Sequence, residues 1–331
     1  MHAPSSTVAL VADIGGTNAR FALATRDGQG RPVLTSMREF TVAQFASLAQ
    51  AALHYLGQID GPRPRRSVIA VASPVTGDEI KATNSSWTFS IAGLQQELGL
   101  EAIEVINDFA AIAMAIPHLT PGELALVGAA QCAPAGSKPD RRHAVVGPGT
   151  GLGVCGLLLR QGRALVIESE GGHIAFAPGG DYEIAILQYL LKRHARVSIE
   201  RLLSGPGLQN LYDAVCAVEG AAAVARTPES ITTGAKLGTE VACQRAVESF
   251  CSILGSFAGD VALMYGAWDG VYLGGGMTTT LLPWICSGEF RQRFENKGRY
   301  RALMQKIPTC AIAHAQPGLL GAGACALDPS V

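Results

Sequence analysis

Two glycine-rich segments have the composition of phosphate-binding turns. Asp13-Ile14-Gly15-Gly16-Thr17 follows the apolar residues 8–12, and Gly149-Thr150-Gly151 follows the apolar residues 144–146. Glycine lets the backbone approach a ligand, successive N–H groups bind an anion, and a threonine hydroxyl can add a donor. A lone Gly-Gly would more simply indicate a tight hairpin turn. Two turns of matching design favour phosphate binding.

Neither turn matches the common nucleotide-binding motifs. No Gly-Lys-Ser/Thr follows them, and neither has the Gly-x-Gly-x-x-Gly spacing that opens a helix in dinucleotide-binding folds. The carboxylate of Asp13 would repel a phosphate unless Mg²⁺ lay between them. We therefore expect Asp13 to hold Mg²⁺, directly or, as we favour, through water. The alternative is a hydrogen bond within its own turn.

Asn107 and Asp108 lie where an apolar segment gives way to a helical pattern. Open α/β sheets bind ligands at the carboxyl ends of their strands, although aspartate is also a favoured N-cap of a helix. In phosphoryl transfer, a carboxylate here would accept a hydrogen bond from the acceptor hydroxyl, align its oxygen and take its proton. Asp108 is thus a candidate general base.

A second polar group, Glu168-Ser169-Glu170-Gly171-Gly172-His173, lies between the apolar segments 164–167 and 174–176, which we expect to be buried strands. Carboxylate and imidazole groups commonly bind neighbouring sugar hydroxyls. No further His or Cys lies at zinc-ligand spacing, and His173 could instead find its partners within the turn. Glu200, taken by itself, is typical of a solvated glutamate in the first turn of a helix.

A third cluster, Gly274-Gly275-Gly276, follows the short apolar segment 271–273. Small residues at the end of a strand let a flat base pack against the backbone, whereas a flexible turn is the alternative. Because two phosphate-binding turns are already indicated, we favour a role near the nucleotide base.

Apolar periodicity predicts the elements that position these residues. Strands and helices alternate in the first third of the chain, as is typical of an α/β protein. Expected strands are residues 7–12, 20–24, 33–40, 67–72, 102–106, a piece of 122–139, a hairpin over 143–159, 164–168, 271–273 and 309–314. Expected helices are residues 43–56, 91–98, 109–116, 182–194, 199–203, 208–218, 239–265 and 319–327.

One internal repeat connects residues 8–17 with residues 144–153. Each is an apolar strand, then a glycine-rich turn with a threonine, then a second apolar strand. The repeat predicts two related domains that face each other across a cleft.

Composition limits the class of protein. The chain has 331 residues, 48% hydrophobic and 16% charged, which is typical of a globular protein with a substantial core. Its net charge of −1 gives no general attraction to nucleic acid or anionic membrane. The basic clusters 63–66 and 141–143 are expected to be solvated loops. The eight cysteines form no C-x-x-C pair, which indicates reduced, mostly buried thiols. No signal peptide or membrane-spanning run is recognisable, so we expect a cytoplasmic protein.

In combination and order, these motifs resemble the bacterial glucokinases of the hexokinase–actin–Hsp70 superfamily. The matching segments are ADIGGTNARFAL (12–23), TGD (76–78), INDFAAIAMAIP (106–117), GPGTGLGV (147–154), EGGHIAF (170–176), SIERLLSGPGLQNLY (198–212), GGGM (274–277) and PGLLGAGA (317–324). The resemblance implies ATP-dependent phosphorylation of glucose at its 6-hydroxyl, with Mg²⁺.

The resemblance also implies an architecture. The fold class is α/β, with two RNase H-like (actin-like ATPase) domains hinged around a central cleft. The small domain is expected over residues 1–118 plus about 315–331, and the large domain, with added helices, over about 119–314. A homodimer is expected.

Roles for single residues follow from the resemblance. It implies that Asp108 is the catalytic base and that the sugar ligands are Asn107, Asp108, Glu170, His173 and Glu200, so that Glu200 is not merely solvated. The turns Asp13–Thr17 and Gly149–Gly151 would bind the phosphates, and Gly274–Gly276 the adenosine side. Two features depart from the family: Asn84-Ser85-Ser86-Trp87 replaces an Asn-His-x-Trp-type stretch, and the tail after Ala326 is short.

Two alternatives stay open at this point. A non-catalytic sugar sensor would bind sugar without turnover, but Asp108 is intact and no helix-turn-helix is recognisable. A kinase or ATPase of the same superfamily could use another acceptor, such as mannose, an amino sugar or an acyl phosphate. The Glu-Gly-Gly-His segment and Glu200 favour a hexose. The sequence leaves open the choice among hexoses and between ATP, ADP and polyphosphate as donor.

Overall fold

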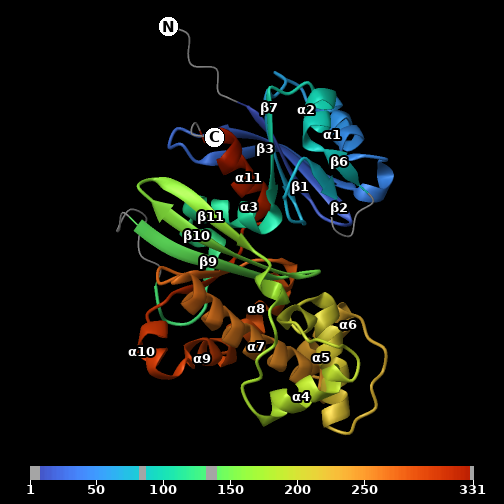
Figure 1. Ribbon diagram of the computed structural model, residues 1–331, viewed down its shortest axis with the longest axis vertical. Helices are drawn as coiled ribbons and strands as arrows, with labels where there is room; N and C mark the ends of the chain where they lie inside the picture. Colours follow the sequence, from blue (N-terminus) through green and yellow to red (C-terminus); the bar gives the residue numbers. More distant parts are fainter. Residues whose placement is uncertain (1–7, 82–86, 132–139, 329–331) are drawn as a thin grey trace. The chain divides into compact units, whose positions relative to one another are not determined.

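The computed structural model describes residues 8–81, 87–131 and 140–328 (Figure 1). The chain divides into two compact units: unit 1 is Met1–Thr120 with His314–Val331, and unit 2 is Pro121–Ala313. The sequence-based domain boundaries, near 118 and 315, lie within a few residues of this division. Asn84, Ser85 and Ser86, where the sequence departs from the family pattern, lie outside the described residues.

Unit 1 is built on one five-stranded sheet with the strand order β3-β2-β1-β4-β7. The strands are β1 (Ala9–Ile14), β2 (Asn18–Arg26), β3 (Pro32–Thr41), β4 (Arg66–Val71) and β7 (Ala102–Asn107). β1, β2 and β3 are antiparallel neighbours, whereas β1, β4 and β7 run parallel. A small hairpin, β5 (Glu79–Lys81) with β6 (Thr88–Ser90), lies outside this sheet.

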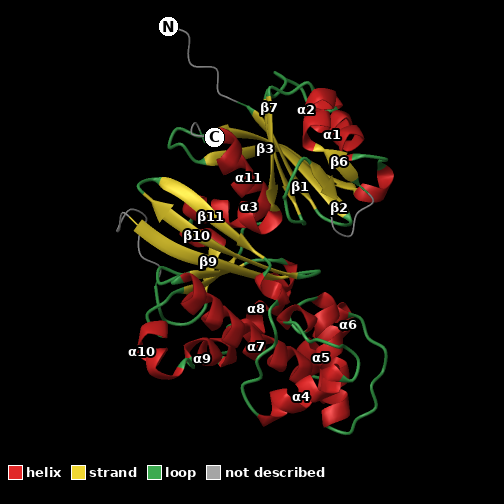
Figure 2. Ribbon diagram, viewed as in Figure 1, coloured by secondary structure: helices red, strands yellow, loops and turns green. Residues whose placement is uncertain are grey.

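Helices cover both faces of this sheet, as Figure 2 shows. They are α1 (Leu48–Gly57), α2 (Ile91–Leu98), α3 (Asp108–Ala115) and α11 (Pro317–Leu327), with single 3₁₀ turns η1 (Val42–Gln44) and η2 (Ile116–His118). Side chains of a strand point alternately to its two faces. Leu10 and Ala12 of β1 therefore pack with the core on the α1 and α2 side, and Ala9 and Val11 pack with α11.

Unit 2 repeats this sheet. Its strand order is β11-β10-β9-β12-β13-β8, and the first five strands have the same relative directions as those of unit 1. The strands are β8 (Leu124–Leu126), β9 (Asp140–Pro148), β10 (Leu152–Arg160), β11 (Arg163–Ser169), β12 (Val271–Leu273) and β13 (Thr309–Ile312). The hairpins β1–β2 and β9–β10 occupy equivalent places, which confirms the internal repeat in the sequence.

The helices of unit 2 form one large core with its sheet. They are α4 (Asp181–Leu191), α5 (Gly205–Val218), α6 (Pro228–Leu237), α7 (Val241–Tyr265), α8 (Gly276–Ile285), α9 (Glu289–Glu295) and α10 (Arg301–Met304). Single 3₁₀ turns are η3 (Pro121–Glu123), η4 (Gly171–His173), η5 (Ile199–Arg201) and η6 (Gly298–Tyr300). Both α7 and α8 pack against β9.

The long helix α7 qualifies one sequence-based statement. It is long and apolar enough to cross a membrane by length and composition, although no apolar run of that kind was expected. Its apolar residues include Phe250, Leu254, Phe257 and Val261, which are buried in the core of unit 2. The core accounts for the composition of this helix.

Two helix predictions are wrong, and several elements were not expected. The expected helix 43–56 splits into η1 and α1, because Ser47 caps α1 by accepting a hydrogen bond from Gln50 N–H. The expected helix 199–203 is only the 3₁₀ turn η5. The helix α6 was not expected, although Thr227 caps it and Pro228 occupies its first turn, which is a recognisable start signal.

Three segments differ from expectation in how far their side chains are exposed. Leu165 and Ile167 of β11 are 54% and 52% exposed, because β11 is an edge strand with a neighbour on one side only. The following segment is not a buried strand either, since Ile174 is exposed and Ala175 forms only an isolated bridge with Ser198. The basic cluster 141–143 belongs to β9, where His143 is buried.

The basic cluster 63–66 lies in a loop as expected over residues 63–65, where Arg63 and Arg65 are exposed, and only Arg66 belongs to β4. The cysteines behave as expected: those in the described part of the chain are free, and all of these except Cys286 are buried.

Candidate active site

The turn between β1 and β2 is held by backbone hydrogen bonds. Gly15 N–H donates to Asn18 O at 2.9 Å, and Val42 N–H donates to Thr17 O at 2.8 Å. The register pairs Ile14 with Ala19, so Gly15, Gly16 and Thr17 form the tip of a tight hairpin. Because the Gly15 N–H is already used, a phosphate here would take the N–H groups of Gly16 and Thr17.

Asp13 lies one residue before the end of β1, at the start of α11. A Cβ atom placed on Gly318 would lie 3.0 Å from Asp13 Oδ2, so a side chain there would crowd the carboxylate. The nearest cation is Arg20, whose Nη1 is 3.9 Å from Oδ2, and the Asp13 side chain is 23% exposed. Burial raises the pKa of Asp13 above its ordinary value, against an opposing effect of Arg20. A carboxylate in these surroundings is stabilised by an additional cation.

Asn107 and Asp108 lie at the same edge of the sheet as this turn. β1, β4 and β7 are parallel and in register, with Ile14 beside Val71 and Val71 beside Asn107. Asn107 Oδ1 accepts hydrogen bonds from the N–H groups of Phe109 and Ala110 at 2.9 and 3.3 Å, and so caps α3. The capping residue is therefore Asn107, and Asp108 is the first residue of the helix.

In unit 2, three of the proposed sugar ligands lie in one row. His173 Nδ1 is 3.9 Å from Glu200 Oε1, and His173 Nε2 is 3.9 Å from Glu170 Oε2. The backbone aligns η4 with η5, because Ile199 N–H donates to Ile174 O at 2.9 Å and Phe176 N–H to Val197 O at 3.1 Å. Segments far apart in the sequence thus place these side chains side by side.

A pocket of about 270 Å³ opens beside this row. Thr150 of the β9–β10 turn lines it together with His173 and Glu200. The other lining residues are Ser198, Arg201, Ser204, Pro206, Gly207 and Asn210. A residue of the predicted phosphate turn and two predicted sugar ligands therefore share one concave surface within unit 2.

The third glycine cluster packs against the strand that carries this turn. Gly274 N–H donates to Val146 O at 2.9 Å. Gly275 has a φ of 79°, and a Cβ atom there would lie 2.4 Å from Pro148 O. Both the conformation and the close approach require glycine. The first residue of α8, Gly276, follows directly, so this cluster adjoins the start of the Gly149–Gly151 turn.

Comparison with known proteins assigns the chain to a family. A family model described as Glucokinase matches residues 10–329. A glucokinase of Xanthomonas campestris pv. campestris (strain B100) is 47% identical over 328 residues, which cover 99% of this chain and 97% of that protein. The chain belongs to the glucokinase family. The expected enzyme class is thereby confirmed: the protein is an ATP-dependent hexose kinase, a glucokinase that transfers the γ-phosphate of ATP to the 6-hydroxyl of glucose.

Solved structures agree with this assignment. The crystal structure of a glucokinase from an Antarctic psychrotroph has a TM-score of 0.88 at 37% identity and covers 97% of this chain and 99% of its own. A ROK-family glucokinase from Streptomyces griseus, in complex with glucose and AMPPNP, has a TM-score of 0.64 at 17% identity, with 96% and 99% coverage. The second similarity concerns the fold alone.

The segment 198–212 is one of the matching motifs, but several of its residues that line the pocket were not expected to do so. Arg201 and Asn210 line the pocket, and Asn210 Nδ2 donates to Arg201 O at 2.9 Å. Gly318, beside Asp13, was also missed as a site residue, although it lies in a motif shared with the glucokinase family. Arg201 and Asn210 are only nine residues apart, but neither residue type by itself indicates a pocket. Gly318 gave no signal because its contact with Asp13 joins distant parts of the chain.

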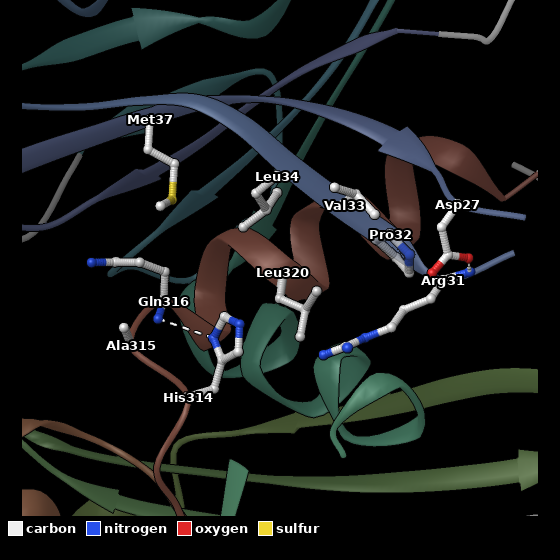
Figure 3. Close-up of a pocket in the computed structure, with 10 residues that line it drawn as sticks. All are labelled: Asp27, Arg31, Pro32, Val33, Leu34, Met37, His314, Ala315, Gln316 and Leu320. Carbon is white, nitrogen blue, oxygen red and sulfur yellow. Dashed lines mark hydrogen bonds between the residues drawn. The ribbon is translucent and has the colours of Figure 1, made fainter. Parts of the chain in front are cut away.

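A second pocket, of about 290 Å³, lies within unit 1 (Figure 3). Leu34 and Met37 of β3 face Leu320 of α11 there, and His314 Nδ1 accepts a hydrogen bond from Gln316 N–H at 3.0 Å. Its lining includes none of the predicted site residues.

Proposed function

We propose that Glu170, His173 and Glu200 bind the hydroxyl groups of glucose, together with Asn107 and Asp108. The observation that carries this proposal is that His173 and Glu200 line one pocket together with Thr150, and that Glu170 lies 3.9 Å from the His173 ring. Carboxylate oxygens accept from sugar hydroxyls, and imidazole can donate or accept. A hexose offers neighbouring hydroxyls to such a row, whereas an acyl phosphate does not.

Asp108 is the proposed general base. Its carboxylate accepts a hydrogen bond from the 6-hydroxyl, orients the oxygen and takes the proton as the new O–P bond forms. The position of Asp108 at the start of α3, at the carboxyl edge of the sheet, supports this role. The turns Gly15–Thr17 and Gly149–Gly151 supply backbone N–H groups to the phosphate oxygens, and Gly274–Gly276 lies on the adenosine side.

Asp13 is the proposed residue for Mg²⁺, held through water. Its burial and its raised pKa fit a carboxylate that needs a cation beyond Arg20. When bound, Mg²⁺ offsets part of the negative charge of the phosphates. No cluster of metal-ligating side chains occurs among the described residues, which agrees with an ion held by one carboxylate, water and substrate.

Four broader expectations stay proposals. We propose that each unit has the RNase H-like fold of the hexokinase–actin–Hsp70 superfamily, which the shared strand order supports. The central cleft between such domains stays a prediction from the family resemblance. A homodimer and a cytoplasmic location are likewise predicted and await measurement.

The test is turnover of purified protein with Mg·ATP and a panel of sugars, followed by ADP release. We expect the highest kcat/KM with glucose. Turnover confined to another acceptor would move the substrate assignment, and glucose binding without any turnover would favour the non-catalytic sensor.

Asp108→Asn tests the base. Asn107 caps α3, so this variant is expected to fold, while turnover falls by roughly 10²- to 10⁴-fold. Asp60→Asn, at an exposed carboxylate of the same unit, is the matched control and should keep wild-type turnover. Near-normal turnover by folded Asp108→Asn would remove Asp108 from the mechanism.

A further inference from the structure

Glu200 contacts the predicted phosphate turn as well as the sugar row. Glu200 Oε2 accepts a hydrogen bond from Leu152 N–H at 2.9 Å, directly after Gly151. A Cβ atom on Gly151 would lie 2.7 Å from the same oxygen. Glu200 Oε1 is directed toward His173, whose Nδ1 is 3.9 Å away. One carboxylate thus joins the backbone of the turn to the sugar row.

We propose that Gly151 is a positioning residue for glucose binding, and that Glu200 couples the sugar row to the phosphate turn. The inference rests on the proposed function, because it takes Glu200 as a sugar ligand and Gly149–Gly151 as a phosphate turn. It adds that Gly151, although it belongs to the phosphate turn, is required for sugar binding. Only a residue without a side chain leaves room there for the Glu200 carboxylate.

The contact is reinforced at the other end of the turn. Gly205 N–H donates to Gly149 O at 2.8 Å, and Ser204 Oγ donates to Glu200 O at 2.8 Å. Ser204 Oγ in turn accepts from Gly207 N–H at 3.0 Å and caps α5. The segment 200–207 therefore contacts the turn at both of its ends, at Gly149 and at Leu152. A shift of the turn would disturb this segment, and a shift of the segment would disturb the turn.

The chemistry of the carboxylate explains the coupling. A hydrogen bond to an ionised group is roughly twice as strong as a neutral one, so Leu152 N–H fixes Oε2. Oε1 is then oriented toward His173 and toward a sugar hydroxyl. A methyl group at Gly151 would approach Oε2 more closely than real Cβ atoms do. Glu200 would have to move, lose the Leu152 bond and turn Oε1 away from the sugar.

Coupling of this kind is reciprocal. A phosphate bound at the turn fixes Leu152 N–H, hence Glu200, and a sugar bound to Glu200 fixes the turn. Each ligand is therefore expected to strengthen binding of the other by the same factor.

The first experiment compares Gly151→Ala with Gly122→Ala, by calorimetric titration of glucose without nucleotide. Gly122 lies in η3 of unit 2, outside the proposed site, and a Cβ atom there would meet nothing within 4 Å, so Gly122→Ala is a matched control. We expect Gly151→Ala to raise the Kd for glucose by roughly 10- to 100-fold, the range for losing a hydrogen bond to a charged group. Gly122→Ala should leave this Kd unchanged within about a factor of two.

The second experiment measures the reverse direction and does not require Gly151→Ala to fold. AMPPNP with Mg²⁺ is titrated without glucose into Glu200→Ala and Glu170→Ala. Glu170 lies on the other side of the His173 ring from Glu200. Glu200→Ala should weaken nucleotide binding several-fold, whereas Glu170→Ala should leave it unchanged.

The outcomes separate the two proposals. Wild-type protein that binds no glucose would overturn the proposed function and the coupling with it. Wild-type protein that binds glucose, with equal effects of Gly151→Ala and Gly122→Ala, would overturn only the coupling. So would wild-type nucleotide affinity in Glu200→Ala. A selective loss in Gly151→Ala and in Glu200→Ala supports it.

Discussion

At the scale of single residues, neighbouring side chains divide the local tasks between them. Asn107 caps α3. Asp108 Oδ1 also accepts a hydrogen bond from Phe109 N–H at 3.0 Å, and an asparagine at this position would keep such an acceptor. Sequence analysis could not decide which of the two residues is the cap, because aspartate and asparagine are about equally good caps. The backbone decided it by ending β7 at Asn107. The proposed base can therefore be exchanged for asparagine without loss of the cap.

Asp13 shows the opposite relation between stability and function. Burial raises its pKa, so its protonated form is favoured in the folded state. The contribution of such an acid to the free energy of unfolding is fully present below its unfolded pKa of 3.8. This contribution is lost as the pH rises through the pKa of the folded state. At neutral pH the ionised carboxylate therefore weakens the fold when no cation is bound.

The expected result for Asp13→Asn is a Tm at pH 7, without nucleotide, equal to or above that of wild type. Turnover should fall by roughly two orders of magnitude, because an electrostatic contribution to transition-state stabilisation is lost. Thermal unfolding and ADP release measure the two effects, with Asp60→Asn as an unaffected control. A clear drop in the Tm of Asp13→Asn would show that the carboxylate stabilises the fold instead.

At the scale of elements, α9 is joined to α10 and β13 by one buried cation. The Arg291 guanidinium donates to Ile307 O at 2.8 Å, Met304 O at 2.9 Å and Thr309 Oγ1 at 3.1 Å. Its Nε donates to Glu295 Oε1 at 2.6 Å. The sequence analysis assigned no element between 283 and 308, and an arginine in a predicted core is not expected from composition.

Arg291→Leu should destabilise unit 2 by about 3–5 kcal/mol, because buried carbonyls and Glu295 lose their partner. Urea unfolding of the free protein measures the difference. Arg299→Leu, at an exposed arginine close by in sequence, is the matched control and should stay within about 0.5 kcal/mol of wild type. Equal stability of the two variants would show that the acceptors find other donors.

The elements that were predicted wrongly share one cause. The segment 199–203 has the composition of a helix, yet it forms a single turn because Ile199 pairs with Ile174 and Glu200 turns toward Leu152. The apolar run of residues 164–167 predicts a strand correctly, but not that it lies at the edge of the sheet. Local pattern predicts the type of element, and neighbours decide its length and burial.

At the scale of the whole molecule, acid stability depends on a buried neutral base. His143 on β9 packs edge-to-face against Tyr272 of β12. Burial, and then the charge of Arg141, lowers the pKa of His143 from 6.5 to about 4. Between pH 6.5 and 4, His143 is protonated in the unfolded chain but neutral in the folded protein. Its contribution to the free energy of unfolding is therefore fully present above pH 6.5 and falls as the pH drops toward 4.

His143→Phe should remove this dependence. We expect the wild-type free energy of unfolding to fall by about 3 kcal/mol through this group between pH 7 and 4. In His143→Phe, the free energy of unfolding should no longer show this part of its decrease with falling pH. His54→Gln, at an exposed histidine, should show the same decrease as wild type. Denaturant unfolding at pH 7, 5.5 and 4.5 gives the comparison. Identical slopes for wild type and His143→Phe would contradict the assignment.

The sequence by itself determined the local features of this protein. Apolar runs, turn glycines and the repeat of residues 8–17 at 144–153 predicted the hairpins that lead to both predicted phosphate turns. The order of the motifs identified the family. These features depend on neighbouring residues along the chain, and for this reason the sequence contains them directly.

Only the tertiary structure decided which side chains meet. Glu200 reaches Leu152 N–H across 48 residues, and Gly318 packs beside Asp13 although nearly the whole chain separates them. Sequence pattern treated Glu200 as solvated and did not single out Gly318. The reason is physical: contacts between distant segments are set by how sheets and helices pack, and that packing depends on the whole core rather than on any one stretch.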